Sequence, residues 1–319
     1  MPELKMGLVE GPSTDEPGRV WDLVVAGGGP AGMSAAIYAA RYSLETLVLE
    51  GMEPGGQLSL TARIENYPGV PGTSGADLAS AMRQQVLDSG STVRSEVVRS
   101  AEDKGEDGIA VATDSSDYAA RFLMIATGAA PKRLGVPGEE RLHGRGVSYC
   151  ATCDAPFFRD AHVMVVGGGD SAVKEAMHLA DFADRVTLIH RRDELRAEPI
   201  LARRIQSREG VEILWSTTLE EILGDDSVEG VILNRDGERQ RMNLDGVFLY
   251  VGRSPATGPF RGLVELGDDG TVVTENNVLT SHSRVVAAGD VTDNPLRQIV
   301  TAVGDGARAA TAVYEKLKG

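Results

Sequence analysis

Two copies of one pattern predict that this chain of 319 residues folds as an α/β protein with two similar domains. Each copy has a short apolar run, a glycine-rich turn, a run with helical spacing and a second short apolar run. The first copy begins at residue 21 and the second at residue 162. Segments rich in Gly and Pro flank the second copy, at residues 129–138 and 252–258. The sequence therefore predicts a second domain inserted into a discontinuous first domain.

In the first copy, residues 21–26 predict a strand and the run that continues to Tyr42 predicts a helix. Between them, residues 27–32 read Gly-Gly-Gly-Pro-Ala-Gly. The glycines of such a motif allow a tight turn, close approach of a pyrophosphate and close packing of helix on strand. A second strand, residues 46–49, ends at Glu50, 23 positions after the first glycine. A carboxylate there accepts a hydrogen bond from a free ribose hydroxyl, so this unit suits FAD or NAD.

The second copy repeats the order and the spacing. Residues 162–166 and 186–189 predict strands, and residues 171–182 predict a helix after the turn Gly-Gly-Gly-Asp-Ser-Ala at 167–172. The second strand closes in His190-Arg191-Arg192, again 23 positions after the first glycine. Two arginines at this strand end can grip a 2′-phosphate, which favours NADPH. The alternative is an ordinary solvated basic patch.

Further strands are predicted at residues 108–112, 121–126 and 284–287, with a helix over residues 297–317. Two of these strands end in small residues, Ala126-Thr127-Gly128 and Ala288-Gly289-Asp290. Such ends allow close approach to a flat cofactor, although ordinary tight turns use the same residues. We therefore assign residues 20–130 and 256–319 to an FAD-binding domain, 131–255 to an NADPH-binding domain and 1–19 to a flexible acidic extension.

Composition excludes several classes of protein. Hydrophobic residues make up 42% of the chain, which is enough for two cores at about 150 residues per domain. The 32 basic and 47 acidic residues give a net charge of -15, which would repel nucleic acid and anionic membranes. No apolar run reaches the roughly 18 residues of a membrane-spanning helix. We expect a soluble, cytoplasmic protein that acts on a small molecule or another protein.

The two cysteines occur in one tetrapeptide, Cys150-Ala151-Thr152-Cys153, directly before Asp154. A single pair builds no disulfide framework, and in a reducing compartment it is more often catalytic or metal-binding. The CxxC spacing lowers one thiol pKa from about 8.5 to ~7 or below, and the resulting thiolate supports disulfide exchange. Asp154 is a candidate acid/base, with a helix N-cap as the alternative role.

From about Trp21 to the C-terminus, the chain resembles the low-molecular-weight thioredoxin reductases. Small departures from the family pattern occur at Ala155, where glycine is frequent, and at Lys174, where an acid is frequent. The motifs that carry the resemblance are the turn at 27–32, Gly55-Gly56-Gln57-Leu58, Glu65-Asn66-Tyr67-Pro68-Gly69, the segment 150–154, the turn at 167–172, His190-Arg191-Arg192-Asp193 with Arg196, Gly289-Asp290, and Arg297-Gln298 with Thr301-Ala302.

The resemblance implies a homodimeric flavoprotein, an NADPH-dependent thioredoxin-disulfide reductase. Hydride would pass from NADPH to FAD, electrons would pass to the Cys150–Cys153 disulfide, and the dithiol would exchange with oxidised thioredoxin or a thioredoxin-like protein. In the family, Cys153 is the sulfur nearer the flavin and Cys150 attacks the partner's disulfide. Asp154 supplies the proton that the departing thiolate needs.

The motifs and the resemblance together define the expected cofactor contacts, and no metal site is expected. For FAD these residues are Gly27, Gly29, Pro30, Ala31, Gly32, Glu50, Gly56, Gln57, Leu58, Asn66, Thr127, Gly128, Gly289, Asp290, Arg297, Gln298 and Ala302. For NADPH they are Gly167, Gly169, Asp170, Ser171, Ala172, His190, Arg191, Arg192 and Arg196.

Three other functions fit parts of the sequence. A related flavoprotein would reduce a peroxiredoxin or a glutaredoxin-like protein, but those acting on peroxiredoxins often carry extra thioredoxin-like domains. An NADPH oxidase or ferredoxin reductase of the same architecture would leave the cysteine pair without a role. A zinc site with His143 as an added ligand would still lack a fourth ligand. The reductase hypothesis accounts for both nucleotide units and for the cysteines.

Overall fold

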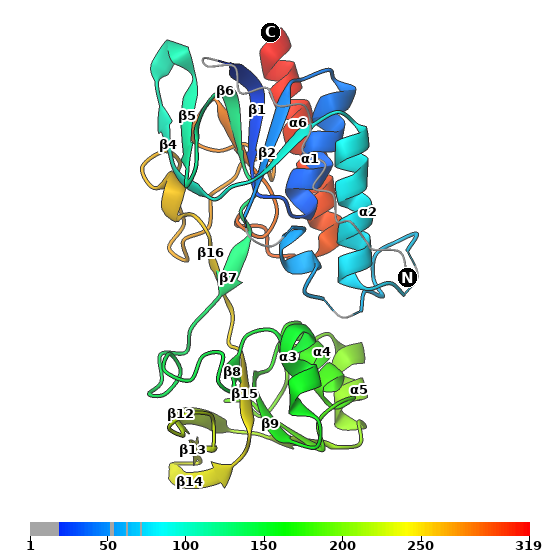
Figure 1. Ribbon diagram of the computed structural model, residues 1–319, viewed down its shortest axis with the longest axis vertical. Helices are drawn as coiled ribbons and strands as arrows, with labels where there is room; N and C mark the ends of the chain where they lie inside the picture. The colour runs from blue at the N-terminus through cyan, green and yellow to red at the C-terminus, as the bar shows by residue number, and fades with distance from the viewer. Residues whose placement is uncertain (1–18, 52–53, 62, 71) are drawn as a thin grey trace, which may run out of the picture. The chain divides into compact units, whose positions relative to one another are not determined.

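A computed structural model describes residues 19–51, 54–61, 63–70 and 72–319 (Figure 1). The predicted extension over residues 1–19 lies outside the described part of the chain, except for Arg19. The chain divides into two compact units, one formed by the residues up to Ala130 with Pro255–Gly319 and the other by Pro131–Ser254. The two connecting segments, β7 (Ala129–Pro131) and β16 (Arg253–Pro255), pair as a two-stranded sheet.

The first unit is built on a seven-stranded sheet in the order β3-β2-β1-β6-β5-β4, with β17 also paired to β6. The long strand β6 pairs with β5 along its first half and with β17 along its last residues. The pairs among β1, β2, β3, β6 and β17 are parallel, whereas β4 and β5 form an antiparallel meander with β6. The strands are β1 (Val20–Ala26), β2 (Thr46–Glu50), β3 (Thr92–Ser95), β4 (Val98–Asp103), β5 (Ile109–Thr113), β6 (Asp117–Ile125) and β17 (Val285–Ala287).

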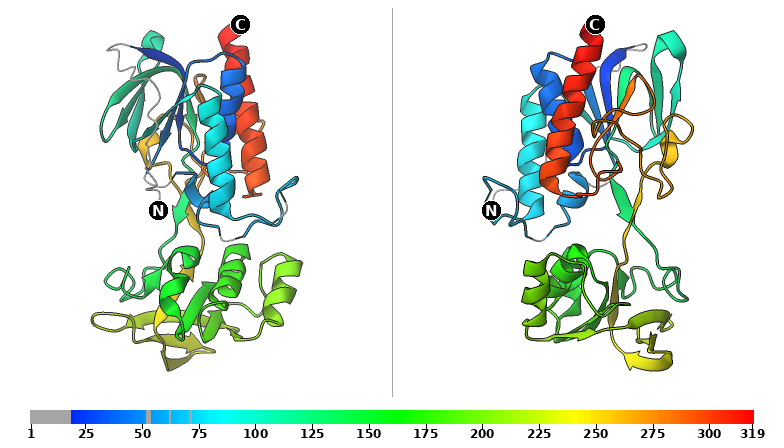
Figure 2. Two further views of the ribbon diagram at one scale, coloured as in Figure 1. Left: turned by 45° about the vertical axis from the view of Figure 1, so that its right-hand side comes forward. Right: turned by 180° about the vertical axis from the view of Figure 1, so that it is seen from behind.

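Three helices cover one face of this sheet, as Figure 2 shows: α1 (Pro30–Arg41), α2 (Gly75–Asp88) and α6 (Ile299–Lys318). Their buried faces form one apolar cluster with strand residues such as Leu23 and Val48. The other face packs against the meander and the segment around Phe260. Short 3₁₀ turns occur at Gly56–Leu58 (η1), Gly105–Asp107 (η2) and Gly258–Phe260 (η4).

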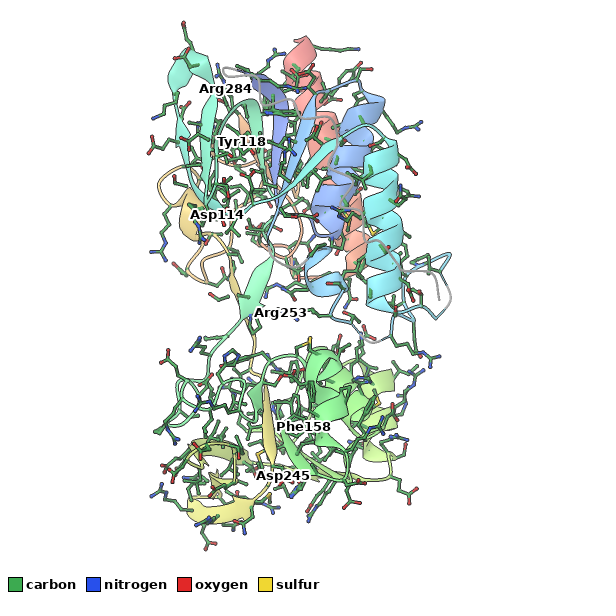
Figure 3. The ribbon with its side chains drawn as sticks, viewed as in Figure 1. Asp114, Tyr118, Phe158, Asp245, Arg253 and Arg284 are labelled. Carbon is green, nitrogen blue, oxygen red and sulfur yellow. A yellow bond between two sulfur atoms is a disulfide. The ribbon has the colours of Figure 1, made fainter. Side chains whose placement is uncertain are left out.

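The second unit has a parallel five-stranded sheet in the order β11-β10-β9-β15-β8 and an antiparallel three-stranded sheet, β12-β13-β14. Phe158, labelled in Figure 3, packs its ring edge-on against Phe248 with the centroids 5.2 Å apart. The elements are β8 (Val147–Ser148), α3 (Ala151–Asp154), η3 (Ala155–Phe158), β9 (His162–Gly167), α4 (Asp170–Leu179), β10 (Arg185–Ile189), α5 (Pro199–Gln206), β11 (Val211–Leu214), β12 (Thr217–Leu223), β13 (Gly230–Arg235), β14 (Glu238–Asn243) and β15 (Gly246–Tyr250).

The predicted duplication is real in three dimensions. Leu23 of β1 pairs with Thr46 of β2, and His162 of β9 pairs with Arg185 of β10. The two copies therefore join their first two strands with the same offset along the chain. The prediction of an α/β fold with two Rossmann-like units, one inserted into the other, is confirmed.

Several predicted boundaries are wrong by a few residues. The strand predicted at 121–126 begins at Asp117, because its first residues pair with β5. The helix predicted to reach 182 ends at Leu179, where the chain tightens and the Phe182 N–H bonds to the Leu179 carbonyl oxygen. The last helix begins at Ile299 because Gln298 forms its N-cap. Within the described ranges, no helix has both the length and the apolar character needed to cross a membrane.

Replacing Gly306 of α6 by alanine should destabilise the protein, although alanine usually favours a helix. A Cβ at residue 306 would lie 2.1 Å from the carbonyl oxygen of Ala31 in α1, and backbone atoms cannot move aside cheaply. The free energy of unfolding should fall by about 1–3 kcal/mol in urea titrations. Gly304 is the matched control in the same helix, because beyond its chain neighbours and its own helix backbone no atom of the described residues lies within 4 Å of its Cβ position. There we expect a gain of up to about 1 kcal/mol. A stabilising Gly306→Ala would contradict the close contact of α1 with α6.

Candidate active site

The turn between β1 and α1 forms a backbone cradle. Gly27 has a φ of 120°, and a Cβ at Gly32 would lie 1.9 Å from the Gly27 carbonyl oxygen. The third glycine of the motif therefore permits the close packing of helix and turn. No atom of the described residues lies within 4 Å of a Cβ at Gly29, the N-cap of α1, and none of their side chains caps this helix. The free N–H groups of its first turn suit an anion.

Glu50 closes β2 beside this cradle. The side chain is buried, and its Oε2 would lie 2.7 Å from a Cβ at Gly28. Arg83 of α2 donates from Nε to the other carboxylate oxygen, Oε1, at 2.9 Å. Sequence reasoning missed Arg83 because it lies 33 residues from Glu50 in a helix without a recognisable motif. One oxygen of Glu50 is thus fixed by an ion pair while the other faces the turn.

The loop after β17 reaches the same cradle. A Cβ at Gly289 would lie 3.1 Å from the Cβ of Ala31 and 3.7 Å from that of Ala302. The structure therefore brings together predicted residues from three separate segments of the sequence. Close approach of these backbones is possible because small residues occupy all three positions.

Polar side chains tie the surrounding loops of the first unit together. Asn66 donates from Nδ2 to Oε1 of Gln298 at 2.9 Å, and the Gln57 side chain donates to the Ala129 carbonyl oxygen. Thr127 donates to the Ala256 carbonyl oxygen at 2.8 Å. The remaining residues predicted for this site lie in the same turns and loops: Pro30, Gly56, Leu58, Gly128, Asp290 and Arg297.

The second glycine turn repeats the geometry of the first. Gly169 is the N-cap of α4, and none of the described atoms lies within 4 Å of its Cβ position. Ala172, which replaces the third glycine, would be only 2.7 Å from a Cβ at Gly167. A Cβ at Gly168 would meet the His190 ring at 2.4 Å, as one at Gly28 would meet Glu50. Sequence reasoning gave these middle glycines no role, although they occupy equivalent positions in the two copies.

His190 is buried at the end of β10, and among the described residues its Nε2 has no hydrogen-bond partner. Burial lowers the pKa of the imidazole, and the positive charges of Arg196, Arg192 and Arg191 lower it further. The ring is therefore neutral at pH 7. A buried and unpartnered ring nitrogen beside an open glycine turn is suited to a ligand hydrogen bond.

The predicted arginines follow His190 in an exposed loop that folds back on the glycine turn. The Arg196 N–H donates to the Gly168 carbonyl oxygen at 2.7 Å, and the Glu198 N–H donates to Oδ1 of Asp170 at 2.8 Å. Asp170 therefore holds this loop with one of its carboxylate oxygens. Ser171 is exposed beside it.

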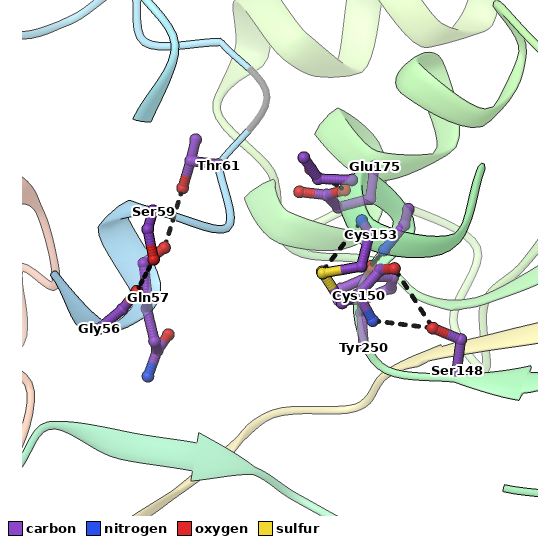
Figure 4. The surroundings of a disulfide bond; sticks show 11 residues. Gly56, Gln57, Ser59, Thr61, Ser148, Cys150, Cys153, Glu175 and Tyr250 are labelled. Carbon is purple, nitrogen blue, oxygen red and sulfur yellow. Dashed lines mark hydrogen bonds between the residues drawn. A yellow bond between two sulfur atoms is a disulfide. The ribbon is translucent and has the colours of Figure 1, made fainter. Parts of the chain in front are cut away.

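Cys150 and Cys153 form a disulfide at the start of α3, with their Cα atoms 5.3 Å apart (Figure 4). The Cys153 N–H donates to Sγ of Cys150 at 3.2 Å, and the Cys150 N–H donates to Oγ of Ser148 at 3.0 Å. Cys153 is exposed and Cys150 is half-buried. After reduction, the Cys153 N–H is positioned to stabilise a thiolate on Cys150.

Two side chains that the sequence did not single out hold the residues between the cysteines (Figure 4). The Ala151 N–H donates to the hydroxyl oxygen of Tyr250 at 2.7 Å. Thr152 donates from Oγ1 to Oε2 of Glu175 at 3.4 Å, and its backbone N–H also bonds to this carboxyl group. Burial raises the pKa of Glu175 to about 7, and burial followed by the Glu175 charge raises the pKa of Tyr250.

Asp154 ends α3 and is half-buried. It occupies the N-cap position of η3, but its side chain makes no capping hydrogen bond. The alternative role of Asp154 as a side-chain helix cap is therefore wrong. His143, the added ligand of the zinc alternative, packs against Tyr149 with the ring centroids 5.3 Å apart. The described residues contain no cluster of three or more potential metal ligands.

The paired glycine turns and the CxxC disulfide define a class of protein. A family model for pyridine nucleotide-disulphide oxidoreductases matches residues 21–306. The chain therefore belongs to the pyridine nucleotide-disulphide oxidoreductase family.

Within this family, the chain is similar to proteins named thioredoxin reductase. It is 44% identical over 306 residues to that of Listeria monocytogenes, with 94% of this chain and 96% of the relative covered. It is 42% identical over 298 residues to that of Bacillus subtilis, with coverage of 92% and 94%. The crystal structure of Lactococcus lactis thioredoxin reductase matches with a TM-score of 0.90 and 40% identity, covering 92% of this chain and 98% of that one.

Glu175 should make the oxidised protein less stable as the pH rises. Its folded-state pKa is raised from 4.5 to about 7, so between these values the folded protein holds a proton that the unfolded chain has lost. Stability therefore falls with pH in this window. Relative to Glu175→Gln, which does not titrate, the wild type should lose on the order of 3 kcal/mol at 1.36 kcal/mol per pKa unit.

Urea unfolding of both proteins at a series of pH values measures this difference. Glu209→Gln, which removes an exposed carboxylate of the same unit, should follow the wild type. Parallel stability curves for the wild type and Glu175→Gln would contradict the raised pKa of Glu175.

Proposed function

We propose that this protein is an NADPH-dependent flavoprotein that reduces the disulfide of thioredoxin. The observation that carries the proposal is the Cys150–Cys153 disulfide, which lies in the same unit as the second glycine turn. An oxidase or ferredoxin reductase would make no use of this pair. The names of the relatives at 42–44% identity support thioredoxin as the partner.

The first glycine turn fits FAD. The open space at Gly29 and the uncapped start of α1 suit the pyrophosphate, and Oε2 of Glu50 suits a ribose hydroxyl. Arg83 orients that carboxylate through its ion pair. Ala31, Gly289 and Ala302 offer backbone close to the same space.

The second glycine turn fits NADPH. Gly169 faces open space, and Nε2 of His190 lacks a partner among the described residues. Arg191, Arg192 and Arg196 supply positive charge for a 2′-phosphate. In a chain with a net charge of -15, three arginines at this strand end favour a binding role over a solvated patch.

If bound at the two glycine turns, FAD and NADPH would supply hydride-transfer chemistry, the source of two electrons for the disulfide. The chain's own residues then govern the thiols. The Cys153 N–H stabilises a thiolate on Cys150, and the second thiol resolves the mixed disulfide with the partner. We assign to Asp154, next to the pair, the proton for the departing thiolate.

Two observations bear on which sulfur attacks the partner. The family resemblance assigns the attack to Cys150, whose sulfur accepts the Cys153 N–H. In the structure, however, Cys153 is the more exposed residue. Single-cysteine variants can be mixed with a thioredoxin that lacks its resolving cysteine and whose remaining cysteine is held as a disulfide with a small aromatic thiol. The attacking thiolate displaces the aromatic thiol and forms a stable mixed disulfide, so the faster-reacting variant identifies the attacking cysteine.

We also propose that the protein works as a homodimer in the cytoplasm. The dimer follows the family resemblance. The location is supported by cysteine usage, since one catalytic CxxC pair without further cysteines is typical of a reducing compartment. Thioredoxin or a thioredoxin-like protein is the partner.

Consumption of NADPH by the FAD-loaded protein, with and without oxidised thioredoxin, tests the proposed function. Thioredoxin should accelerate the consumption, and Cys150→Ser should lose that acceleration while still oxidising NADPH slowly. One slow rate in every mixture would contradict thioredoxin as the partner and leave the nucleotide sites unaffected.

Replacing Arg191 and Arg192 by alanine should weaken NADPH binding selectively. Each lost charge-assisted hydrogen bond should weaken the free energy of NADPH binding by about 1.5–3 kcal/mol. NADH should be little affected, because it has no 2′-phosphate for the arginines to contact. Isothermal titration with both nucleotides measures the two affinities. Arg203→Ala, which removes an exposed arginine of α5, is the control for a general loss of positive charge. Equal losses for NADPH and NADH would refute the assignment.

A further inference from the structure

Backbone N–H groups in the first turn of α3 donate hydrogen bonds to three acceptors of different chemistry. Ala151 bonds to the phenol of Tyr250, Thr152 to the carboxyl group of Glu175 and Cys153 to the sulfur of Cys150. While the cysteines form the disulfide, Glu175 is the only one of these three acceptors that titrates near neutral pH. It also receives the Thr152 hydroxyl, so it holds the residue midway between the cysteines twice.

Polar and charged groups act on Glu175 from several elements around α4. Thr152 of α3 bonds to it, Tyr250 of β15 and Arg253 of β16 interact with its charge, and Asp154 at the end of α3 acts on Tyr250. Lys174 precedes Glu175 in α4 itself. The remaining neighbours, α5, β9 and β10, present apolar side chains to this helix: Leu201, Ile205, Val163, Val165, Val186 and Leu188.

These surroundings bring the pKa of Glu175 close to neutral pH, so the protonated and the charged form are both populated there. Burial is the largest influence and raises its pKa to about 7, against the hydrogen bonds from Thr152 and the charges of Arg253 and Lys174. A new negative charge nearby would raise the pKa further. Reduction of the disulfide produces such a charge, because one sulfur of a CxxC pair is left as a thiolate near neutral pH.

We propose that Glu175 is a positioning residue of the disulfide reaction, which holds the Thr152 peptide between the cysteines and takes up a proton when the pair is reduced. The inference rests on the proposed function, in which the pair cycles between disulfide and dithiol. The carboxylate, the disulfide, two electrons and two protons from water become a protonated carboxyl group, one thiol and one thiolate. The charge on the two sides balances. Re-oxidation by a partner's disulfide consumes the thiolate, and Glu175 then releases its proton.

The pH dependence of the disulfide midpoint potential tests this proposal without NADPH or thioredoxin. The FAD-loaded protein is equilibrated with mixtures of reduced and oxidised dithiothreitol, and the Cys150 and Cys153 thiols are counted by alkylation. One extra proton per two electrons adds about 30 mV for each tenfold change in proton concentration. Between about pH 7 and pH 9, the wild-type potential should therefore fall more steeply than that of Glu175→Gln, by up to this amount per pH unit.

Glutamine keeps an oxygen acceptor for Thr152 but cannot take up a proton near neutral pH. The Glu175→Gln variant therefore removes the titration while it retains the hydrogen bond. Glu209→Gln should keep the wild-type slope. Equal slopes for the wild type and Glu175→Gln would overturn the proposal, even if both proteins reduce thioredoxin. Conversely, failure with thioredoxin would leave this result untouched.

A second measurement needs no variant. Infrared difference spectra of the wild-type protein, prepared with glutamate labelled at the side-chain carboxyl carbon, compare the oxidised and reduced states at about pH 8. A labelled, protonated carboxyl band should appear on reduction. Absence of that band would also overturn the proposal.

Discussion

The turn at residues 150–154, called here the redox turn, needs hydrogen-bond acceptors for the backbone N–H groups of Ala151 and Thr152, the two residues between its cysteines. A helix as short as α3 cannot satisfy its own first turn, and here the acceptors come from Tyr250 at the end of β15 and Glu175 in α4. Both elements belong to the second unit, in which α4 packs against the parallel sheet that contains β15. The spacing and orientation of the sulfurs are therefore set by the sheet and by the helix that starts at the second glycine turn. A change that shifts β15 against α4 would disturb the cysteines without touching them.

The two copies of the scaffold place a ligand-contacting residue at the same position, but the residue has different chemistry in each copy. In both copies, the residue that closes the second strand lies over the middle glycine of the turn, Glu50 over Gly28 and His190 over Gly168. The first copy offers a carboxylate steadied by an arginine, and the second offers a neutral imidazole followed by arginines. The same backbone geometry thus supports one turn suited to a ribose hydroxyl and another suited to a 2′-phosphate.

Features encoded by neighbouring residues could be predicted from the sequence. The glycine turns, the strand ends at Glu50 and His190 and the CxxC pair each depend on a few consecutive positions. The Arg83 to Glu50 ion pair and the contacts of Tyr250 and Glu175 with the redox turn could not be predicted, because they join residues 33, 99 and 23 positions apart. Such contacts depend on how helices and strands pack, which no local pattern encodes. The capping role predicted as an alternative for Asp154 is wrong, since its carboxylate makes no capping hydrogen bond to the N–H groups of η3.

The central claim is that electrons reach the partner through the Cys150–Cys153 pair. The most direct measurement is a single turnover without oxygen, in which the FAD-loaded protein is reduced by one equivalent of NADPH and then mixed with excess oxidised thioredoxin. The account predicts thioredoxin dithiol in an amount equal to the active sites, and none when both cysteines are replaced by serine. Dithiol formation by the double-serine protein would contradict the account.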